Sequence, residues 1–408
     1  QGVSSAASDV YKRQALNSRS PSDRMGRSSL LIPALLLLGT GLIGCNQQPT
    51  AQQDSAPPFV FRSLDLNQRR KDGLRDWDLS SPEARYDLSS RTVRARRPTG
   101  ILYRNDQPSF RISAELATVL KDGEMVILEG QVRLQQLNDQ AVLIRGDRLV
   151  WKPAESRMVM DQNPEALDEF SRLTARRLTL IQTSNTLRFE GPTQLLRWKN
   201  RRQAELEPDT DIVASKGIWN LETGDLGVNG PVRALRNKDL EVTASALKGN
   251  TQKGFLDLIQ PVRLKQNEAD INAGTTRWNL ADQRFTSSAR FQGKRQDATA
   301  TGNGFVIDEA TTTVIIPKAC RLSQPGESLT ARRCSWNWLT NRVVADGDVV
   351  LRRREPDQET RAPRMEGQLG SSEGVRFGSS GQRVRSSIRF TPDQPGSATP
   401  SSRSPVSF

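Results

Sequence analysis

Few residues of this chain could perform acid–base, nucleophilic or metal chemistry. Its 408 residues include no histidine, which excludes histidine general bases, nucleophiles activated by histidine and histidine-ligated zinc. Three cysteines are too few for a cysteine zinc cluster once one of them has another role. An enzyme would have to depend on carboxylates, lysine or tyrosine, and we find no convergent cluster of them. We therefore predict no catalytic residue, no metal site and no cofactor.

One cysteine follows an apolar segment near the N-terminus. Residues 1–24 are polar and without pattern, and we exclude them from the fold as a non-native or upstream segment. After Met25, the apolar run from Leu30 to Gly44 is shorter than the ~20 residues of a bilayer span but has the length typical of a signal peptide. The run ends in Leu42-Ile43-Gly44-Cys45, which resembles a bacterial lipobox.

This lipobox resemblance implies a lipid anchor. It predicts a signal peptide over residues 25–44, cleavage before Cys45 and a lipid on that cysteine, followed by a tether and lead-in segment over residues 45–75. The alternative is an uncleaved signal anchor, with Cys45 an ordinary residue near the membrane interface. Both interpretations place the rest of the chain outside the cytoplasm.

The other two cysteines are candidates for a disulfide. Cys320 and Cys334 fall in consecutive strand candidates, and the connection between them contains the turn sequence Gln324-Pro325-Gly326-Glu327. A compartment outside the cytoplasm permits oxidation. We predict a cross-strand or cross-turn disulfide between these two residues.

A short motif recurs along the chain with a period of roughly 30 residues, which is the signature of a repeat architecture. Its first copy, Glu129-Gly130-Gln131-Val132-Arg133-Leu134, is interpreted as a turn residue followed by the start of a strand. Further copies begin at Glu190, Asn229, Gln260 and Asp346. A second motif also recurs: an alanine or glycine lies five residues before a tryptophan, once in every second repeat. We interpret the tryptophan as part of the sheet core. These tryptophans are Trp151, Trp219, Trp278 and Trp336.

The pattern of apolar, polar and turn residues within the repeats predicts the fold class. Apolar and polar residues alternate with a period of two, and Asp122-Gly123 is a hairpin-turn signal. The hydrophobic content of 35% is low for a thick globular core. We predict an all-β chain, an elongated, repetitive antiparallel β-jelly-roll in the form of a half-open β-sandwich, with very little helix.

The segment over residues 76–165 resembles the LptC family of lipopolysaccharide-export proteins and, more broadly, LptA/OstA-like β-jelly-roll modules. The order of four strand motifs carries the resemblance. They are Trp77-Asp78-Leu79, Phe110-Arg111-Ile112-Ser113-Ala114, Ile127-Leu128-Glu129-Gly130-Gln131-Val132 and Leu143-Ile144-Arg145-Gly146-Asp147-Arg148-Leu149-Val150-Trp151. Residues 166–354 then look like further LptA/OstA-like repeats, and residues 355–408 are interpreted as a largely disordered tail.

The resemblance implies a function without chemistry on the protein. A periplasmic module on the inner membrane, here held by a lipid anchor, would accept lipopolysaccharide from an inner-membrane ABC transporter. It would pass the lipid to LptA- or LptD-like modules joined by edge-strand pairing. The sequence departs from the family in its lipobox and in its length, about twice that of the family's core module, which leaves open whether a separate bridge protein is needed.

The acyl chains would lie against an apolar groove. Its candidate residues are the inward positions of the repeated strands: Val126, Leu128, Val132, Leu134, Val142, Ile144, Val232, Val262, Leu264, Val349 and Leu351.

The charge of the chain leaves an alternative function open. A net charge of +13 favours polyanionic partners, but the basic residues are spread along the strands, as on a solvated outer face. The alternative is a β-solenoid envelope scaffold or adhesin that binds acidic polysaccharide. We predict no nucleic-acid partner.

Overall fold

The structure, a computed structural model, describes residues 59–138, 141–203, 205–354, 357–368, 374–378 and 383–389. All of them fall in one compact unit, Ser55–Phe408. The predicted signal peptide, the lipobox with Cys45 and most of the predicted tether lie outside the described residues. They stay predictions.

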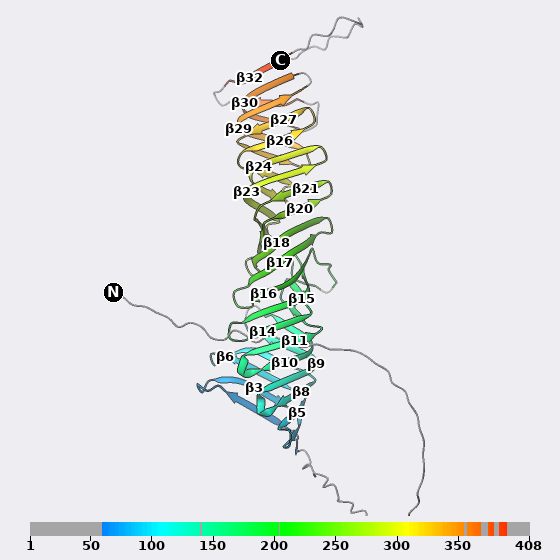
Figure 1. Cartoon of the computed structure of the whole chain (residues 1–408), viewed down its shortest axis with the longest axis vertical. Coiled ribbons are helices and arrows are strands. Elements are labelled where there is room, and N and C mark those ends of the chain that lie inside the picture. The colour runs from blue at the N-terminus through cyan, green and yellow to red at the C-terminus, as the bar shows by residue number, and fades with distance from the viewer. Residues whose placement is uncertain are drawn as a thin grey trace, which may run out of the picture. The chain divides into compact units, whose positions relative to one another are not determined.

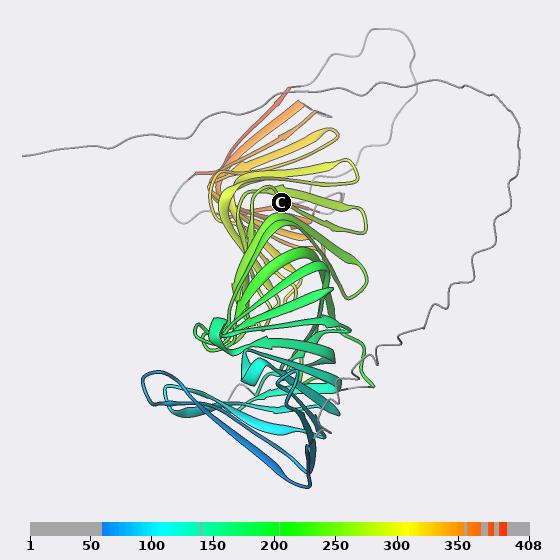
Figure 2. The same ribbon diagram turned by 60° about the horizontal axis from the view of Figure 1, so that its bottom comes forward.

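The described chain is all-β and antiparallel, as the sequence predicts, with two short 3-10 turns, η1 (Lys121–Gly123) and η2 (Pro153–Glu155), as the helical segments of this part. Its strands form two walls, which we call A and B (Figures 1 and 2). Strands of wall A alone are β1 (Phe59–Phe61), β4 (Glu83–Asp87), β5 (Thr92–Arg96), β8 (Leu116–Leu120), β11 (Arg157–Gln162), β14 (Arg177–Ile181), β19 (Phe255–Ile259), β22 (Thr276–Asn279), β25 (Thr313–Ile316), β28 (Arg333–Asn337) and β31 (Arg376–Gly378).

Strands of wall B alone are β2 (Leu64–Arg69), β3 (Arg75–Ser81), β6 (Thr99–Arg104), β7 (Gln107–Ser113), β12 (Glu165–Leu167), β13 (Ser171–Thr174), β20 (Val262–Gln266), β21 (Ala269–Ala273), β26 (Cys320–Gln324), β27 (Glu327–Ala331) and β32 (Arg385–Arg389). Long strands bend from one wall into the other. They are β9 (Met125–Gln136), β10 (Leu143–Lys152), β15 (Thr186–Arg197), β16 (Thr210–Asn220), β17 (Asp225–Arg236), β18 (Leu240–Asn250), β23 (Arg284–Arg295), β24 (Ala298–Asp308), β29 (Arg342–Arg353) and β30 (Asp357–Gln368).

The bend of a long strand is its corner, and β9 shows how the corner is made. Its first half pairs with β8 in wall A, and its second half pairs with β7 in wall B. Between the halves, Gly130 and Gln131 have φ angles of 76° and 44°, and the register with β10 shifts at this point. A β-bulge of this kind bends a strand and increases its twist.

The repeated motif is therefore a corner, and its interpretation as a strand start is wrong for the copy with Gly130 and for three further copies. At the copy that begins at Gln260 the interpretation is right, because β19 ends at Ile259 and β20 starts at Val262. The copies at Gly191, Gly230 and Gly347 also have positive φ angles, each beside a register shift within one long strand. The sequence pattern could not distinguish the two cases, because a turn and a bulge both need a residue that tolerates positive φ. Position 130 favours glycine for a second reason, which is lack of space: the Cβ of any other residue would lie 2.4 Å from a carboxylate oxygen of Glu115.

The opposite side of the sandwich, which we call the mouth, consists of the hairpin turns of the two walls. The chain runs from the mouth of one wall to the corner and on to the mouth of the other wall, then turns and runs back. This out-and-back pair gives the period of roughly 30 residues. The turn at Asp122-Gly123 is one of the wall A turns, and both of its residues have positive φ, as predicted.

The inward side chains form one continuous apolar cluster along the stack. Trp77 and Trp151 meet edge to face with ring centroids 5.3 Å apart, and Trp278 stacks on Phe285 at 5.0 Å. Trp151, Trp219 and Trp278 are buried, while Trp336 is only partly buried.

The structure has no boundary at either of the two positions predicted from the sequence, residues 165 and 354. Strand β12 spans residue 165, and β30, which follows residue 354, pairs with β29 along its whole length. β1 and β2 likewise lie inside the segment that the sequence assigns to the tether and lead-in. The repeat therefore continues through Arg389, beyond the point where the sequence becomes rich in Pro, Gly, Ser and Arg.

Both cysteines of the predicted pair lie near the corner, and a disulfide joins them. Cys320 is on β26 in wall B and Cys334 is on β28 in wall A, with their Cα atoms 5.9 Å apart. They are not on consecutive strands, because β27 lies between them and forms the hairpin with β26 at the predicted turn. The disulfide thus ties wall A to wall B.

Replacing both cysteines by serine is expected to lower the free energy of unfolding by about 3 kcal/mol, because a bridge over a loop of this size removes about that much chain entropy from the unfolded state. Urea titrations of the full chain with and without a reductant measure the difference. Dithiothreitol should destabilise the unmodified chain and leave the serine variant unchanged. Equal titration curves for all four samples would show that the cysteines are not paired.

Candidate functional site

The space between the inner faces of walls A and B, which we call the trough, is the candidate functional site. All eleven predicted groove residues point into it. They are Val126, Leu128, Val132, Leu134, Val142, Ile144, Val232, Val262, Leu264, Val349 and Leu351, and each is between 0% and 4% exposed. The period of two thus gave the correct face for every one of them.

The trough is filled by its own side chains in its N-terminal part. Phe110, Ile112, Leu134 and Ile144 pack from wall B and are buried almost completely. Around Leu173, Phe189 and Trp219, a cavity of only about 20 Å³ is left. Residues facing inward here form a core that leaves no room for a ligand unless the walls move apart.

The trough opens in its C-terminal part. A cavity of about 340 Å³, cavity 1, lies between β21, β23, β24, β26 and β27 of wall B and β25 and β28 of wall A. Its apolar lining includes Ile271, Phe291, Ile316, Leu329 and Leu351. A second cavity of about 410 Å³, cavity 2, extends toward the mouth and includes Leu240, Leu264, Phe285 and Ile307. The two cavities adjoin, because Ile271, Val314, Trp336 and Arg295 line both.

Small residues explain why the walls leave space here. Gly293, Ala298 and Ala300 line cavity 1 on β23 and β24. The corresponding inward positions are Leu134 on β9, Ile144 on β10 and Val142 directly before β10, and their larger side chains fill the space.

Two of the predicted groove residues, Leu264 and Leu351, line the open cavities, and the other nine belong to the closed parts of the core. Sequence reasoning missed Ile271, Phe291, Val314 and Ile316 as cavity residues. Only the sizes of the facing residues could have indicated a cavity there.

Two basic side chains, Lys294 and Arg295, lie at the rim of the cavities. The guanidinium carbon of Arg295 lies 5.6 Å from the ring centroid of Trp336, within the range of a cation–π contact. The side chain of Arg295 forms no hydrogen bond or ion pair with the described residues, whereas Glu327 across cavity 1 is paired with Arg353 at 2.9 Å. Arg295 and the neighbouring Lys294 are therefore available for an anionic group at the rim.

Polar contacts cross the mouth where the trough is closed. Arg104 of wall B pairs with Glu222 of wall A at 2.8 Å, and the Gln136 amide donates a hydrogen bond to the Leu221 carbonyl at 3.4 Å. These partners are far apart in the chain and meet only because the two walls face each other.

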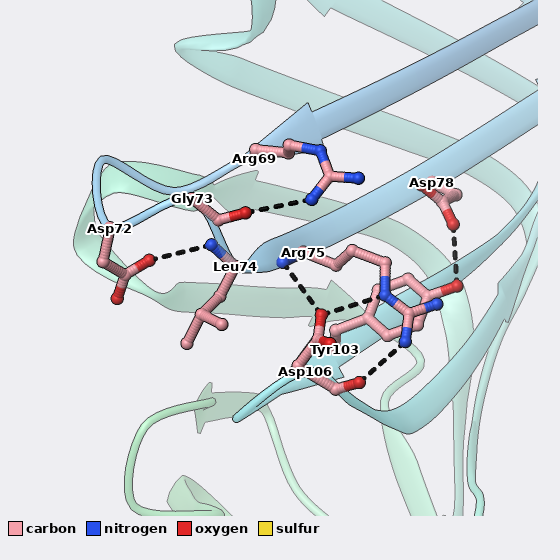
Figure 3. Close-up of polar contacts among 8 residues, drawn as sticks. All are labelled: Arg69, Asp72, Gly73, Leu74, Arg75, Asp78, Tyr103 and Asp106. Atoms are coloured by element: carbon pink, nitrogen blue, oxygen red, sulfur yellow. Dashed lines mark hydrogen bonds and ion pairs between the residues drawn. The ribbon is translucent and has the colours of Figure 1, made fainter.

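The wall B turns beside Arg104 are held by the cluster in Figure 3. Arg75 donates to Asp106 from Nε at 2.9 Å and lies over the Tyr103 ring, and the Tyr103 hydroxyl donates to Asp78 at 2.7 Å. The hydrogen bond from Arg75 lowers the pKa of Asp106, and the hydrogen bond to Asp78 raises the pKa of Tyr103. We interpret this cluster as structural, because each group already has its partner.

Neither a metal site nor a membrane helix was found in the part of the chain that the structure describes. No group of three or more acidic or cysteine side chains there could hold a metal ion. No helix of that part is long and apolar enough to cross a membrane.

Two antiparallel walls that meet at bulged corners around an apolar trough define an elongated β-jelly-roll. Residues 30–163 match the family model described as "LptC: Lipopolysaccharide-assembly, LptC-related", which covers about a third of the chain. This match confirms the resemblance predicted over residues 76–165. Cavities 1 and 2 lie beyond the matched residues.

A solved structure is also similar to part of the chain. It is the crystal structure of LptH, described as the LptA homologous periplasmic component of the conserved lipopolysaccharide transport device from Pseudomonas aeruginosa. The two are 12% identical with a TM-score of 0.26, over 38% of this chain and 95% of LptH. No curated protein sequence matches the chain.

Proposed function

We propose that the chain is a periplasmic component of lipopolysaccharide transport that holds acyl chains in its trough. The observation that carries this proposal is the apolar space of cavities 1 and 2 within a β-jelly-roll whose residues 30–163 match the LptC-related family model. Each cavity lies in the size range typical of ligand pockets, roughly 300–1,000 Å³. Each buried methylene group contributes about 0.8 kcal/mol, so acyl chains can be held without polar specificity.

The proposed transport has two steps, transfer of the lipid from a donor to this chain and transfer from this chain to an acceptor. Lipopolysaccharide would arrive from an inner-membrane ABC transporter and leave to an LptA- or LptD-like module. The ends of the stack supply edges for such neighbours, since among the described strands β1 and β2 each pair on one side only, as do β31 and β32 at the other end. Phe59, Val60 and Phe61 on β1 are exposed, which favours that edge as a docking strand.

A lipid on Cys45 would hold the chain at the membrane, and we place it at the inner membrane because the proposed donor is there. The alternative role in binding acidic polysaccharide is disfavoured by the outer face. Many of its arginines already have carboxylate partners, such as Arg233 with Glu241 and Arg277 with Asp257. This pairing reduces the positive charge available to a polyanion.

Photo-crosslinking in cells tests the proposal. A photoreactive residue at Phe291, which lines cavity 1, is expected to form an adduct with lipopolysaccharide, because acyl chains would lie against this position. The matched control is Gln292, the next residue of β23, which is exposed on the outer face. A probe at Leu128 or Val132 should react only when the walls separate.

The proposal fails if the adduct at Gln292 is as strong as that at Phe291, or if neither forms. Depletion of the chain gives a second readout, the accumulation of lipopolysaccharide at the inner membrane.

A further inference from the structure

One arginine is buried at the mouth, where the closed part of the trough meets cavity 2. Arg236 is the last residue of β17 in wall B, and it reaches across the mouth to Glu309, in the wall A turn after β24. Their side chains approach to 3.2 Å, with exposed fractions of 2% for Arg236 and 20% for Glu309.

The guanidinium of Arg236 is only partly satisfied. Its Nη2 faces Glu309, but Nε and Nη1 are buried and have no hydrogen-bond partner among the residues that the structure describes. The group lies over the ring of Trp278, with the guanidinium carbon 5.5 Å from the ring centroid. Buried donors without partners cost free energy, so this fork of N–H groups is suited to an anion that offers more oxygens than Glu309 does.

Glu309 is a poor permanent partner. Burial raises its pKa, and Asp239, Asp209 and Asp308 add negative charge around it. These three carboxylates disfavour the ionised form of Glu309 and would oppose any other anion here as well, so a replacement for Glu309 must interact with Arg236 more strongly than Glu309 does. A competing anion that interacts more strongly with Arg236 would release Glu309 toward the solvent at the mouth.

The position of Glu309 connects this pair with the apolar space. Glu309 lines cavity 2 together with Leu240, Phe285 and Ile307. An alkyl chain that fills cavity 2 can therefore place its polar end beside Glu309, within the neighbourhood of Arg236. Arginine suits such an end because its planar guanidinium matches the oxygens of a phosphate in a bidentate manner.

We propose that Arg236 binds the phosphate headgroup of an amphiphile whose chain occupies cavity 2, and that Glu309 takes the place of this phosphate in the ligand-free chain. This inference rests on the proposed function, because it needs the cavity to accept an alkyl chain. It adds a specificity for phosphorylated lipids that an apolar trough alone would not have.

Binding of simple amphiphiles to the full chain tests the inference. The probes are dodecyl phosphate and dodecyl glucoside below their micelle concentrations, and inorganic phosphate, each followed by calorimetry. Arg236→Gln is expected to lower the affinity for dodecyl phosphate by about tenfold, the effect of losing charge-assisted hydrogen bonds, and to leave dodecyl glucoside unchanged. Glu309→Gln should raise the affinity for dodecyl phosphate several-fold, because it removes the competing anion.

Arg233→Gln is the matched control. Arg233 lies on the same strand, with a side chain 66% exposed and paired with Glu241, and its loss should alter neither affinity. Equal losses for both alkyl probes in Arg236→Gln would assign Arg236 a structural role and overturn the inference, as would an unchanged affinity in Glu309→Gln.

Inorganic phosphate that binds as tightly as dodecyl phosphate would identify a site for the free ion and overturn the assignment to an amphiphile. If the unmodified chain binds dodecyl glucoside but shows no preference for dodecyl phosphate, the inference fails while the proposed function stands. If it binds neither alkyl probe, both fail.

Discussion

An Ala300→Trp variant is expected to lose about 200-fold in affinity for a dodecyl chain while it keeps its fold. Ala300 lies on β24 and faces cavity 1, where its small side chain contributes to the space between the walls. An indole ring at this position would occupy room that an alkyl chain needs. Excluding four methylene groups at about 0.8 kcal/mol each corresponds to a loss of this size.

Calorimetry with dodecyl glucoside measures the loss, and denaturation of each variant verifies the fold. Thr301→Trp is the matched control, because Thr301 is the next residue of β24 and faces the opposite side of the wall. It should bind the glucoside like the unmodified chain. Equal affinities for the Ala300→Trp variant and the control would mean that chains do not enter cavity 1.

The repeat, the antiparallel pairing and the inward face of each strand were predictable, because all three depend on local patterns. The corner at Gly130 was only half predictable. Its sequence indicated a residue with positive φ, but the choice between a turn and a bulge depends on the strands on either side. β7, β8 and β10 hold β9 in two walls at once, which no local pattern of β9 records.

The open part of the trough was not predictable from the inward pattern alone. Leu134 and Leu264 hold the same place in the repeated motif, yet the first lies in a closed core and the second lines cavity 2. The difference depends on the summed volume of residues from several strands, such as the small Gly293 and Ala300. The contact between Arg104 and Glu222 was not predictable for a similar reason, because it depends on which turns of the two walls face each other across the mouth.

The recurring tryptophans give a second prediction of large effect. Trp278→Ala is expected to lower the free energy of unfolding by about 4 kcal/mol, since removing a large aromatic side chain from a closed core typically costs 3–5 kcal/mol. Trp278 is 0% exposed and stacks on Phe285, so its removal leaves an enclosed void. Urea denaturation of the full chain measures the loss.

Trp336→Ala is the comparison, because Trp336 holds the equivalent place two repeats later but faces the open cavities. Its removal widens an existing space, so it should cost less than half as much as Trp278→Ala. In a repeat protein each unit contacts mainly its neighbours, so hydrogen exchange should rise around β22 and β23 in the first variant and around β25 and β28 in the second. Equal losses in the two variants would contradict the open trough at Trp336, because a tryptophan in a closed core and one beside a cavity cannot leave the same void.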